Sequence, residues 1–558
     1  APWSDTAPAR AELFGIERLQ QHAESLAHAQ KIAQAPIRVA PLNARLDANA
    51  AVLLAAYRAS AREGERGRAV VPAAEWLLDN YHLVEAQIRE IRDDLPAGYY
   101  RQLPKLAEGP FRGYPRVLGL AWAFVAHTDS CFDAETLRRF VIGYQRVQPL
   151  TIGELWAVAI TLRIVLVENL RRLADQITAG LVARADADRV ADALLAPRGA
   201  QTALADDIAT RHKGPLDEGF AGQLAKRLRG EDPRTMPALD WLEERLRDQG
   251  STVEEAVRHV QERQGASNVS VRNVITSMRL ISDTDWADFF ESVSLVDARL
   301  GEHDGFAAMD FPSRNLYRSA IEELARGSEL SELDVAERAL ATCRAARDMA
   351  GDGDGDGDVD DGDAGAGRVA DPGWHLVAGG RPALERAIGF RPAPRARFAR
   401  LTMRMGILGY IGAILAVAGL LLALAVWALG LPAPSAWLAL WVLAAILPAT
   451  EVAKALVDRA VTTALGATLL PGLELKSGVP TSLRTLVAVP TLLTSAADLR
   501  EQIDRLEVHY LSGSGGDLSF ALLTDGLDAA QETLDTDAVL LAQAEAEIAA
   551  LNLRHAPG

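Results

Sequence analysis

Residues 405–450 read MGILGYIGAILAVAGLLLALAVWALGLPAPSAWLALWVLAAILPAT. These 46 residues contain no Asp, Glu, Lys or Arg, in a chain that is 24% charged overall. Residues 406–430 are enough to cross a hydrocarbon core of about 30 Å as a helix, and a second apolar run covers residues 436–456. Pro-Ala-Pro at 432–434 predicts a turn between them. The pattern predicts a transmembrane helical hairpin, and the alternative is a buried hairpin in the core of a soluble protein.

Basic residues flank this hairpin and are absent from its turn. Lys454 and Arg459 lie at the end of the second apolar run and just after it. The arginines before the first run are Arg391, Arg395, Arg397, Arg400 and Arg404. Because Lys and Arg accumulate on the cytoplasmic side of a membrane, we expect both flanking parts of the chain to be cytoplasmic. We also expect the cluster to face anionic lipid headgroups, so the lipid bilayer is a predicted partner.

The remaining composition limits the classes of partner. The chain has a formal net charge of −17, and 49% of its 558 residues are hydrophobic, which is ample for two or more folded domains. Binding a polyanion needs a basic face, which the sequence lacks outside the arginine cluster, so we expect no nucleic acid partner. Cys131 and Cys343 lie far apart and show no metal-binding spacing. Nothing in the pattern predicts an oligomeric state.

The N-terminal part of the sequence is predicted to be helical. Apolar residues recur there at three- and four-residue spacing, which is typical of amphipathic helices. The clearest segments are residues 12–32, 46–61, 73–94, 135–146, 154–179 and 252–264. No fixed-period repeat occurs, so a solenoid is not indicated. We therefore predict a mainly α chain in which residues 1–349 form an irregular all-α cytoplasmic domain.

Residues 350–370 are predicted to be an acidic Gly/Asp linker. Their Gly-Asp repeat matches the ligand positions of a calcium-binding loop at Asp352, Asp354, Asp356, Asp358 and Asp363. A Gly-Asp repeat meets that pattern by composition alone, and the last position is Asp where a bidentate Glu is usual. No helix-forming segment is expected directly after the repeat, in residues 364–373. A solvated flexible linker is therefore the alternative to a calcium site.

The rest of the chain is divided by changes in its pattern. We predict a short folded element and a basic juxtamembrane segment at 371–404, two transmembrane helices at 405–457, an interfacial amphipathic segment at 458–482, and an α/β segment at 483–558. Residues 451–470 suit an amphipathic helix at the membrane surface. In the α/β segment, short apolar runs alternate with helical patterns, in the order 483–490, 496–511, 518–524 and 531–551. This β-α-β-α order is the opening of a parallel sheet.

The candidate binding residues follow the two predicted strands, because ligands of open parallel sheets bind beyond the carboxyl ends of the strands. They are Pro490, Thr491, Leu492, Thr494 and Asp525. The carboxylate of Asp525 could accept hydrogen bonds from a nucleotide base or ribose. The alternative is an Asp that caps a turn between a strand and a helix.

A second acidic pattern is Asp535-Thr-Asp537, which has the D-x-D spacing of a metal–diphosphate site. It stands at the start of a predicted helix, where acidic residues complement the helix dipole, so we interpret it as capping. The motifs GxxxxGK[ST], GxGxxG, HExxH and GxSxG do not occur in the sequence. Their absence removes the commonest NTPase, dinucleotide-binding, metalloprotease and hydrolase interpretations.

Five long strings of the sequence are the most distinctive. They are WLLDNYHLVEAQIREIRDDLP at 76–96, GYYRQLPKL at 98–106, NVITSMRLIS at 273–282, FFESVSLVD at 289–297 and VAVPTLLT at 487–494. With these strings the chain resembles the N-terminal part of the bacterial cyclic β-1,2-glucan synthases. The resemblance implies a multi-pass enzyme of the bacterial inner membrane that uses UDP-glucose to elongate a protein-linked β-1,2-glucan at the cytoplasmic face and then cyclises it. It also implies that residues 483–558 begin an A-type glycosyltransferase domain whose uridine pocket includes the five candidate residues.

The sequence departs from that family in one respect. The family's metal-binding acidic motif, catalytic base and Gln-x-x-Arg-Trp motif follow the second βα unit, and none occurs here. We therefore expect no catalytic residue within this chain, no activity of the chain alone, and a requirement for Mg²⁺ or Mn²⁺ only in the intact enzyme. Because the glucan is built on the protein, Tyr510, close to the expected donor pocket, is a candidate priming residue; the alternative is a Tyr packed on a helix face.

Two other functions share the same pattern. A non-catalytic membrane scaffold or regulator could keep this N-terminal region without transferring glucose. A synthase of a linear β-glucan would need the same downstream residues, so the present segment does not distinguish it.

Overall fold

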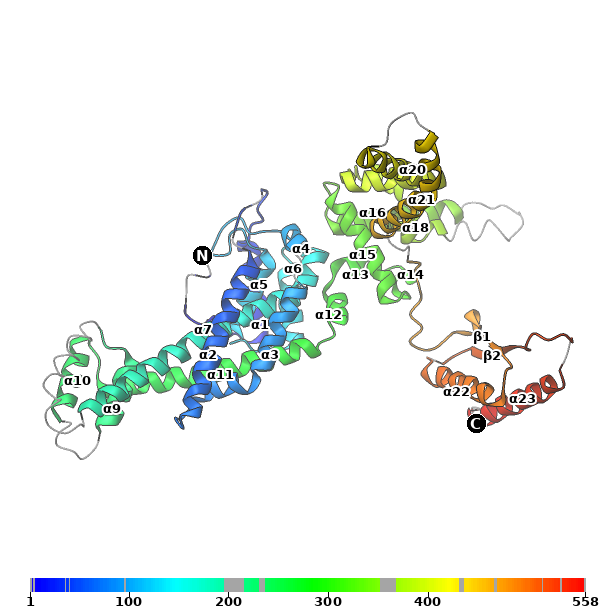
Figure 1. Cartoon of the computed structure of the whole chain (residues 1–558). Coiled ribbons are helices and arrows are strands. Elements are labelled where there is room, and N and C mark those ends of the chain that lie inside the picture. Colours follow the sequence, from blue (N-terminus) through cyan, green and yellow to red (C-terminus); the bar gives the residue numbers. More distant parts are fainter. Residues whose placement is uncertain are drawn as a thin grey trace. The chain divides into compact units, whose positions relative to one another are not determined.

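The structure is a computed structural model of the chain (Figure 1). It describes all residues except 1–2, 4–5, 36, 40, 95–96, 195–214, 230–235, 352–367, 431–435, 466–468, 514, 532–533 and 556–558. The chain divides into two compact units. The first comprises Ala1–Arg299 and Leu330–Ala336, and the second comprises Leu300–Glu329 and Glu337–Gly558.

The first unit is built from helices. They are α1 (Ile16–Ala29), α2 (Leu42–Glu65), α3 (Pro72–Asp94), α4 (Ala97–Gln102), α5 (Arg116–His127), α6 (Ala134–Gln145), α7 (Ile152–Leu194), α9 (Glu218–Leu228), α10 (Met236–Asp248), α11 (Val253–Asp283), α12 (Trp286–Val293) and α13 (Leu295–Leu300). Each of the helices predicted from apolar periodicity is present. The predicted helical character of the N-terminal part is confirmed.

Helix α7 is the element around which this unit packs, and it contacts α2, α3, α5, α9 and α11. A capping box starts it: Thr151 Oγ1 accepts from the backbone N–H of Glu154 (3.2 Å), and Glu154 Oε2 accepts from that of Thr151 (2.9 Å). Arg116 of α5 donates two hydrogen bonds of 2.6 Å to the same carboxylate. The Arg116 and Glu154 side chains are 2% and 0% exposed, so this ion pair lies fully inside the core.

A second buried carboxylate, Glu168, lies further along α7. It accepts hydrogen bonds from Arg45 (2.8 and 2.9 Å), Asn49 (2.8 Å) and Arg172 (3.0 Å). Arg172 also donates to the backbone carbonyl of Ala7 (2.7 Å), which holds the N-terminal segment against the helices. Burial by itself raises the pKa of Glu168, but these hydrogen bonds outweigh it and hold that pKa below its ordinary value of 4.5.

This network predicts that acid weakens the first unit. The pKa of Glu168 is lower in the folded protein than in the unfolded chain. The ionised Glu168 side chain therefore contributes fully to stability above about pH 4.5, and this contribution is lost as the pH falls through the pKa that Glu168 has in the folded protein. Urea unfolding between pH 6 and pH 3 should therefore show a falling midpoint. In Glu168→Gln, which does not titrate, part of that pH dependence should disappear. Identical pH profiles for the two proteins would contradict the assignment.

The second unit contains the remaining elements. They are α14 (Asp304–Ala307), α15 (Phe311–Arg326), α16 (Glu332–Gly351, which starts in the first unit), α18 (Pro372–Val377), α19 (Arg381–Ala387), α20 (Pro394–Leu429), α21 (Ala436–Leu465), a 3₁₀ turn (Thr481–Leu483), β1 (Thr485–Leu492), α22 (Ala496–Ser512), β2 (Leu518–Asp525) and α23 (Asp535–His555). The predicted β-α-β-α order is observed, and its sheet is a small parallel pair.

The short element after the Gly/Asp linker packs on α15. Tyr317 of α15 donates a hydrogen bond to Asp371 (2.9 Å), which also caps α18 by accepting from the N–H of Gly373. A Cβ at position 373 would lie 1.9 Å from the Tyr317 hydroxyl oxygen, so this contact requires glycine. In α19, Glu385 binds Arg400 of α20 through two hydrogen bonds of 2.6 and 2.7 Å. Arg400 is therefore paired with a carboxylate of the protein, whereas the sequence pattern predicted that it would face anionic lipid headgroups.

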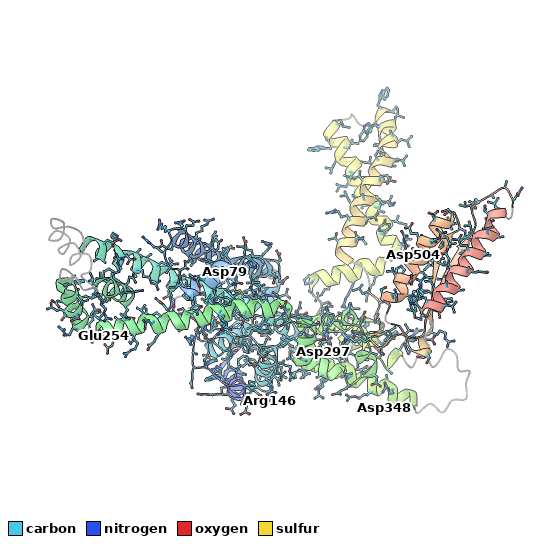
Figure 2. All side chains as sticks on the ribbon, turned by 90° about the horizontal axis from the view of Figure 1, so that it is seen from below. Asp79, Arg146, Glu254, Asp297, Asp348 and Asp504 are labelled. Carbon is cyan, nitrogen blue, oxygen red and sulfur yellow. The ribbon has the colours of Figure 1, made fainter. Side chains whose placement is uncertain are left out.

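Helices α20 and α21 contain two segments long and apolar enough to cross a membrane, Gly406–Leu429 and Ala436–Thr463. Only 6% and 11% of the residues are buried in the most apolar 18-residue stretch of each segment. Figure 2 shows the two helices side by side with their side chains projecting outward. A buried hairpin of a soluble core would need its apolar side chains covered, and the described residues do not cover them. Leaving that surface in water costs about 25 cal/mol per Å². These helices therefore suggest association with a membrane.

Two features of the hairpin differ from the sequence prediction. Helix α20 begins at Pro394, so the basic segment is helical, and it is kinked at Gly406, where φ is 53° and only glycine is relaxed. The amphipathic helix expected at 451–470 is not a separate element, because α21 continues without a break to Leu465. Tyr410 of α20 donates a 2.6 Å hydrogen bond to Asp458 of α21, which ties the two helices together.

Candidate functional site

The candidate site lies in the α/β segment, where β1 and β2 pair in parallel. Their register runs from Thr485 opposite Leu518 to Leu492 opposite Asp525. Helices α22 and α23 cover one face of this sheet through an apolar cluster. Its buried members are Leu493, Leu499, Ile503 and Ala544, and Leu522, Leu540, Ile548 and Leu551 pack against them.

The other face of the sheet, which we call the open face, carries Leu486, Leu492 and Leu523. These side chains are 64%, 58% and 64% exposed, and they occupy the alternate strand positions that point away from the helices. No described residue covers them. Parallel sheets are normally buried on both faces. The described α/β segment therefore has one of the two helical layers that such a sheet usually has.

The carboxyl ends of the two strands meet at one edge, as the sequence predicts. Leu492 and Asp525 are register partners, and the backbone N–H of Leu493 donates to the carbonyl of Asp525 (2.8 Å). The Asp525 side chain is exposed and accepts from the N–H of Gly526 (2.9 Å). Most of its hydrogen-bonding capacity is therefore open to solvent, at the edge where a ligand of a parallel sheet would bind.

The other predicted residues are engaged in local structure. Thr491 is 8% exposed and lies on the helix-covered face. The next residue, Leu492, lies on the open face, and Asp525 is its register partner. The side chains of Thr491 and Asp525 therefore leave opposite faces of the sheet. Thr494 donates to Asp498 (2.6 Å), which is in the first turn of α22. Pro490 lies opposite Leu523 in the strand pair. Their roles in binding uridine stay predictions.

Tyr510 does not lie beside this edge. It is in the last turn of α22, 45% exposed, and its ring packs against Phe520 (centroids 6.2 Å apart) and His555 (5.4 Å). Phe520 precedes Asp525 by five residues, which is roughly 16 Å along a strand. The expectation that Tyr510 lies close to the donor pocket is therefore not met within the described residues. Its role as a priming residue stays a prediction.

No protein-family model matches the sequence. Among curated proteins, the chain is 37% identical over 552 residues to the cyclic beta-(1,2)-glucan synthase NdvB of Rhizobium meliloti. The match covers 98% of the chain and the N-terminal 19% of the synthase. The chain is homologous to the N-terminal part of a cyclic β-(1,2)-glucan synthase. This confirms the resemblance drawn from the sequence strings. The chain spans about a fifth of the length of that relative.

Acidic residues that could serve such a synthase as metal ligands are not gathered within the described residues. No group of three or more His, Cys, Asp and Glu side chains there could hold a metal ion. Asp537 instead accepts from the backbone N–H of Leu534 (2.8 Å), as the capping interpretation of the D-x-D pattern requires. The five Asp residues of the calcium-loop pattern lie outside the described residues. The requirement for Mg²⁺ or Mn²⁺ stays a prediction for the intact enzyme.

Sequence reasoning missed one cavity altogether. It has a volume of about 900 Å³ in the first unit, and cationic side chains from three separate parts of the chain line it. Among them, Arg184 of α7 and Lys226 of α9 are 42 residues apart in sequence. No spacing rule connects residues at such a distance, so only the packing of α9 against α7 reveals the site.

Proposed function

We propose that this chain is the N-terminal part of a membrane-bound cyclic β-1,2-glucan synthase. In that enzyme, glucose passes from UDP-glucose to a protein-linked β-1,2-glucan at the cytoplasmic face of the membrane. The observation that supports this most strongly is the 37% identity over 98% of the chain. An identity sustained over 552 residues includes the helical unit, the hairpin and the α/β segment together.

The proposed topology places the chain in the bacterial inner membrane, with both flanking parts cytoplasmic. It is supported by the arginines before the first span and by Lys454 and Arg459 near the cytoplasmic end of the second. The residues between the spans carry no charge. In this orientation the helical unit and the α/β segment lie on the same side of the membrane, where UDP-glucose is made available.

Residues 483–558 would begin the nucleotide-sugar glycosyltransferase domain. Support comes from the parallel β1-α22-β2 unit and from the exposed carboxylate of Asp525 at its carboxyl edge. Asp525 would accept hydrogen bonds from the uridine base or ribose. A divalent ion would neutralise the diphosphate in the intact enzyme; among the residues that the structure describes, no group of three or more His, Cys, Asp and Glu side chains could hold one.

The proposal is tested by glucose incorporation. Membranes containing the complete gene product should transfer radiolabelled glucose from UDP-glucose into protein-bound glucan, and product analysis should show cyclic β-1,2 linkages. Membranes containing only these 558 residues should incorporate none. If the complete product is inserted and folded but transfers no glucose, the scaffold or regulator function replaces the proposal. A linear product would instead identify a linear β-glucan synthase.

A further inference from the structure

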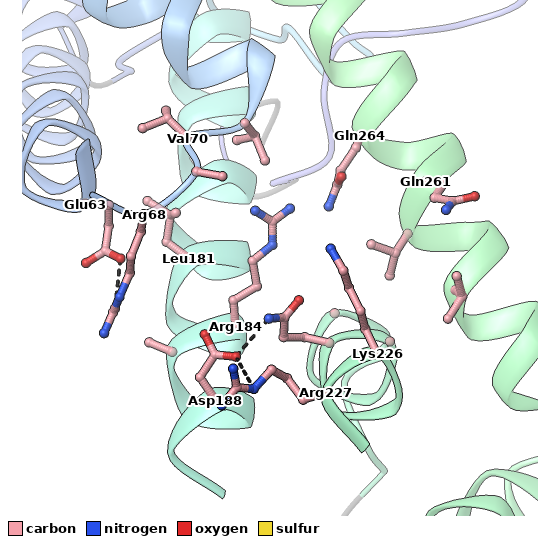
Figure 3. Close-up of a pocket in the computed structure, with 18 of the residues that line it drawn as sticks. Glu63, Arg68, Val70, Leu181, Arg184, Asp188, Lys226, Arg227, Gln261 and Gln264 are labelled. Carbon is pink, nitrogen blue, oxygen red and sulfur yellow. Dashed lines mark hydrogen bonds and ion pairs between the residues drawn. The ribbon is translucent and has the colours of Figure 1, made fainter. Parts of the chain in front are cut away.

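The cavity that sequence reasoning missed lies entirely within the first unit. It is formed by α7, α9, α11 and the connection between α2 and α3 (Figure 3). Its volume of about 900 Å³ is in the range of small-molecule sites in proteins. Helix α9 packs against α11 there: a Cβ built at Gly222 would lie 3.7–3.8 Å from Val257 and Val260, which is ordinary van der Waals contact.

The charged residues that line the cavity do not balance. Its cations are Arg68, Arg184, Lys226, Arg227 and Arg229, and its anions are Glu63, Asp188 and Asp192. Arg68 binds Glu63 (2.9 Å), Arg227 binds Asp192, and Arg229 binds Glu254 outside the cavity (2.7 Å). Arg184 and Lys226 have no hydrogen-bond or ion-pair partner among the described residues. In a chain of net charge −17, Arg184 and Lys226 are therefore the two cations of this cavity that no direct ion pair neutralises within the described residues.

The carboxylate at ion-pair spacing after Arg184 on its own helix is already engaged by other side chains. Asp188 is four residues further along α7, the spacing at which an ion pair normally forms. It instead accepts a 2.8 Å hydrogen bond from Gln223 of α9 and lies 3.7 Å from Nε of Arg227. Figure 3 shows that Arg184, Lys226 and Gln264 point into the same open space.

Arg184 is half-buried, and its environment disfavours its charge. Burial lowers the pKa of its guanidinium, and the nearby Asp188 offsets this only in part. Removing a cation from water without a counter-ion is unfavourable, because its hydration is lost and not replaced. An anion between Arg184 and Lys226 would restore that missing interaction. The guanidinium of Arg and the ammonium of Lys are also groups that proteins commonly use to bind phosphate.

We propose that this cavity binds a small organic phosphate, with Arg184 and Lys226 holding the phosphate group. The amides of Gln261 and Gln264 line the same space and offer hydrogen bonds to neutral oxygens. Apolar residues of the wall, among them Leu181 and Val257, would contact the organic part. This site is independent of the proposed donor pocket, and neither depends on the other.

Calorimetry on the 558-residue chain in detergent tests the proposal, with inorganic phosphate and phenyl phosphate as probes at constant ionic strength. Wild type should bind both saturably, and phenyl phosphate about 10-fold more tightly because its ring buries apolar wall. Arg184→Gln and Lys226→Gln should each weaken binding by about 10-fold or more, since each removes a charged hydrogen-bond donor. Lys226 is exposed, so its variant should fold normally.

Arg189→Gln is the matched control. Arg189 is on the same helix, is exposed and pairs with Asp186 (2.7 Å), so this variant should bind the probes as wild type does. A loss in Arg189→Gln equal to that in Arg184→Gln would show general charge attraction and overturn the proposal. Absence of saturable binding by wild type would also overturn it.

A second readout separates a ligand site from a structural role. Without ligand, Arg184→Met should keep or raise the unfolding temperature, because it removes a half-buried charge that has no partner. Phenyl phosphate should then raise the unfolding temperature of wild type but not of the variant. A lower unfolding temperature for Arg184→Met without ligand would show that Arg184 supports the fold, and would count against the proposal.

Discussion

Replacing Glu154 by Ala is expected to lower the free energy of unfolding of the first unit by about 3–5 kcal/mol, the cost of breaking a buried ion pair. The substitution leaves Arg116, which is 2% exposed, without its counter-ion. It also removes the carboxylate that accepts from Thr151 at the start of α7. Urea unfolding, followed by hydrogen–deuterium exchange in α5 and α7, measures the loss directly in the elements concerned.

Glu135 supplies a matched control on a different helix. Like Glu154, it is in the first turn of a helix and binds arginine side chains, Arg138 (2.6 Å) and Arg139 (2.8 Å). These three side chains are 38–50% exposed, so water replaces the lost contacts. Glu135→Ala should leave the urea midpoint nearly unchanged. Equal losses for the two variants would show that burial is not what makes the Glu154 pair important.

A double variant tests the physical reason. Arg116→Met with Glu154→Leu removes both charges, so neither remains buried without a partner. It should recover much of the stability that Glu154→Ala loses, because the penalty comes from the isolated charge rather than from the missing contact. No recovery would instead assign the loss to the capping box of α7.

The sequence predicted the helices whose apolar residues follow a regular stripe, but not their full extent. Helix α7 was expected at 154–179 and continues to Leu194, and α11 was expected at 252–264 and continues to Asp283. The extension of α7 is rich in Ala, Arg and Asp and has few large apolar residues. It is helical because Ala187, Val190 and Ala191 pack in one buried cluster with Phe220 of α9. Apolar periodicity within one segment does not contain that information.

Contacts between distant segments were the other part that the sequence did not show. The division at residue 349 rested on the composition of the linker, whereas the structure groups Leu300–Glu329 with the second unit. The Tyr317–Asp371 hydrogen bond spans that linker and shows why. The carboxyl edge of the sheet was predictable, because parallel strands end together. Which face each side chain takes was not, because it depends on the register that places Asp525 opposite Leu492.

Replacing Asp525 by Ala should reduce glucose incorporation by the complete synthase about 100-fold, if its carboxylate holds the nucleotide. A hydrogen bond to a charged group contributes about 1.5–3 kcal/mol, so losing one or two to the base or ribose accounts for an effect of that size. The effect should be largest in kcat/KM for UDP-glucose. Asp525→Asn keeps one acceptor oxygen and should lose about 10-fold.

Asp504→Ala is the matched control for this prediction. Asp504 is an exposed carboxylate on α22 of the same segment (Figure 2), and it does not follow a strand, so its loss should leave incorporation unchanged.

The competing interpretation is that Asp525 only caps a turn, through its 2.9 Å hydrogen bond from Gly526. A capping residue would lower stability and leave KM for UDP-glucose as it is. The two interpretations therefore predict opposite results: binding lost with the fold intact, or the fold weakened with binding intact. Since the Asp525 side chain is exposed and most of its acceptor capacity is free, we expect the first.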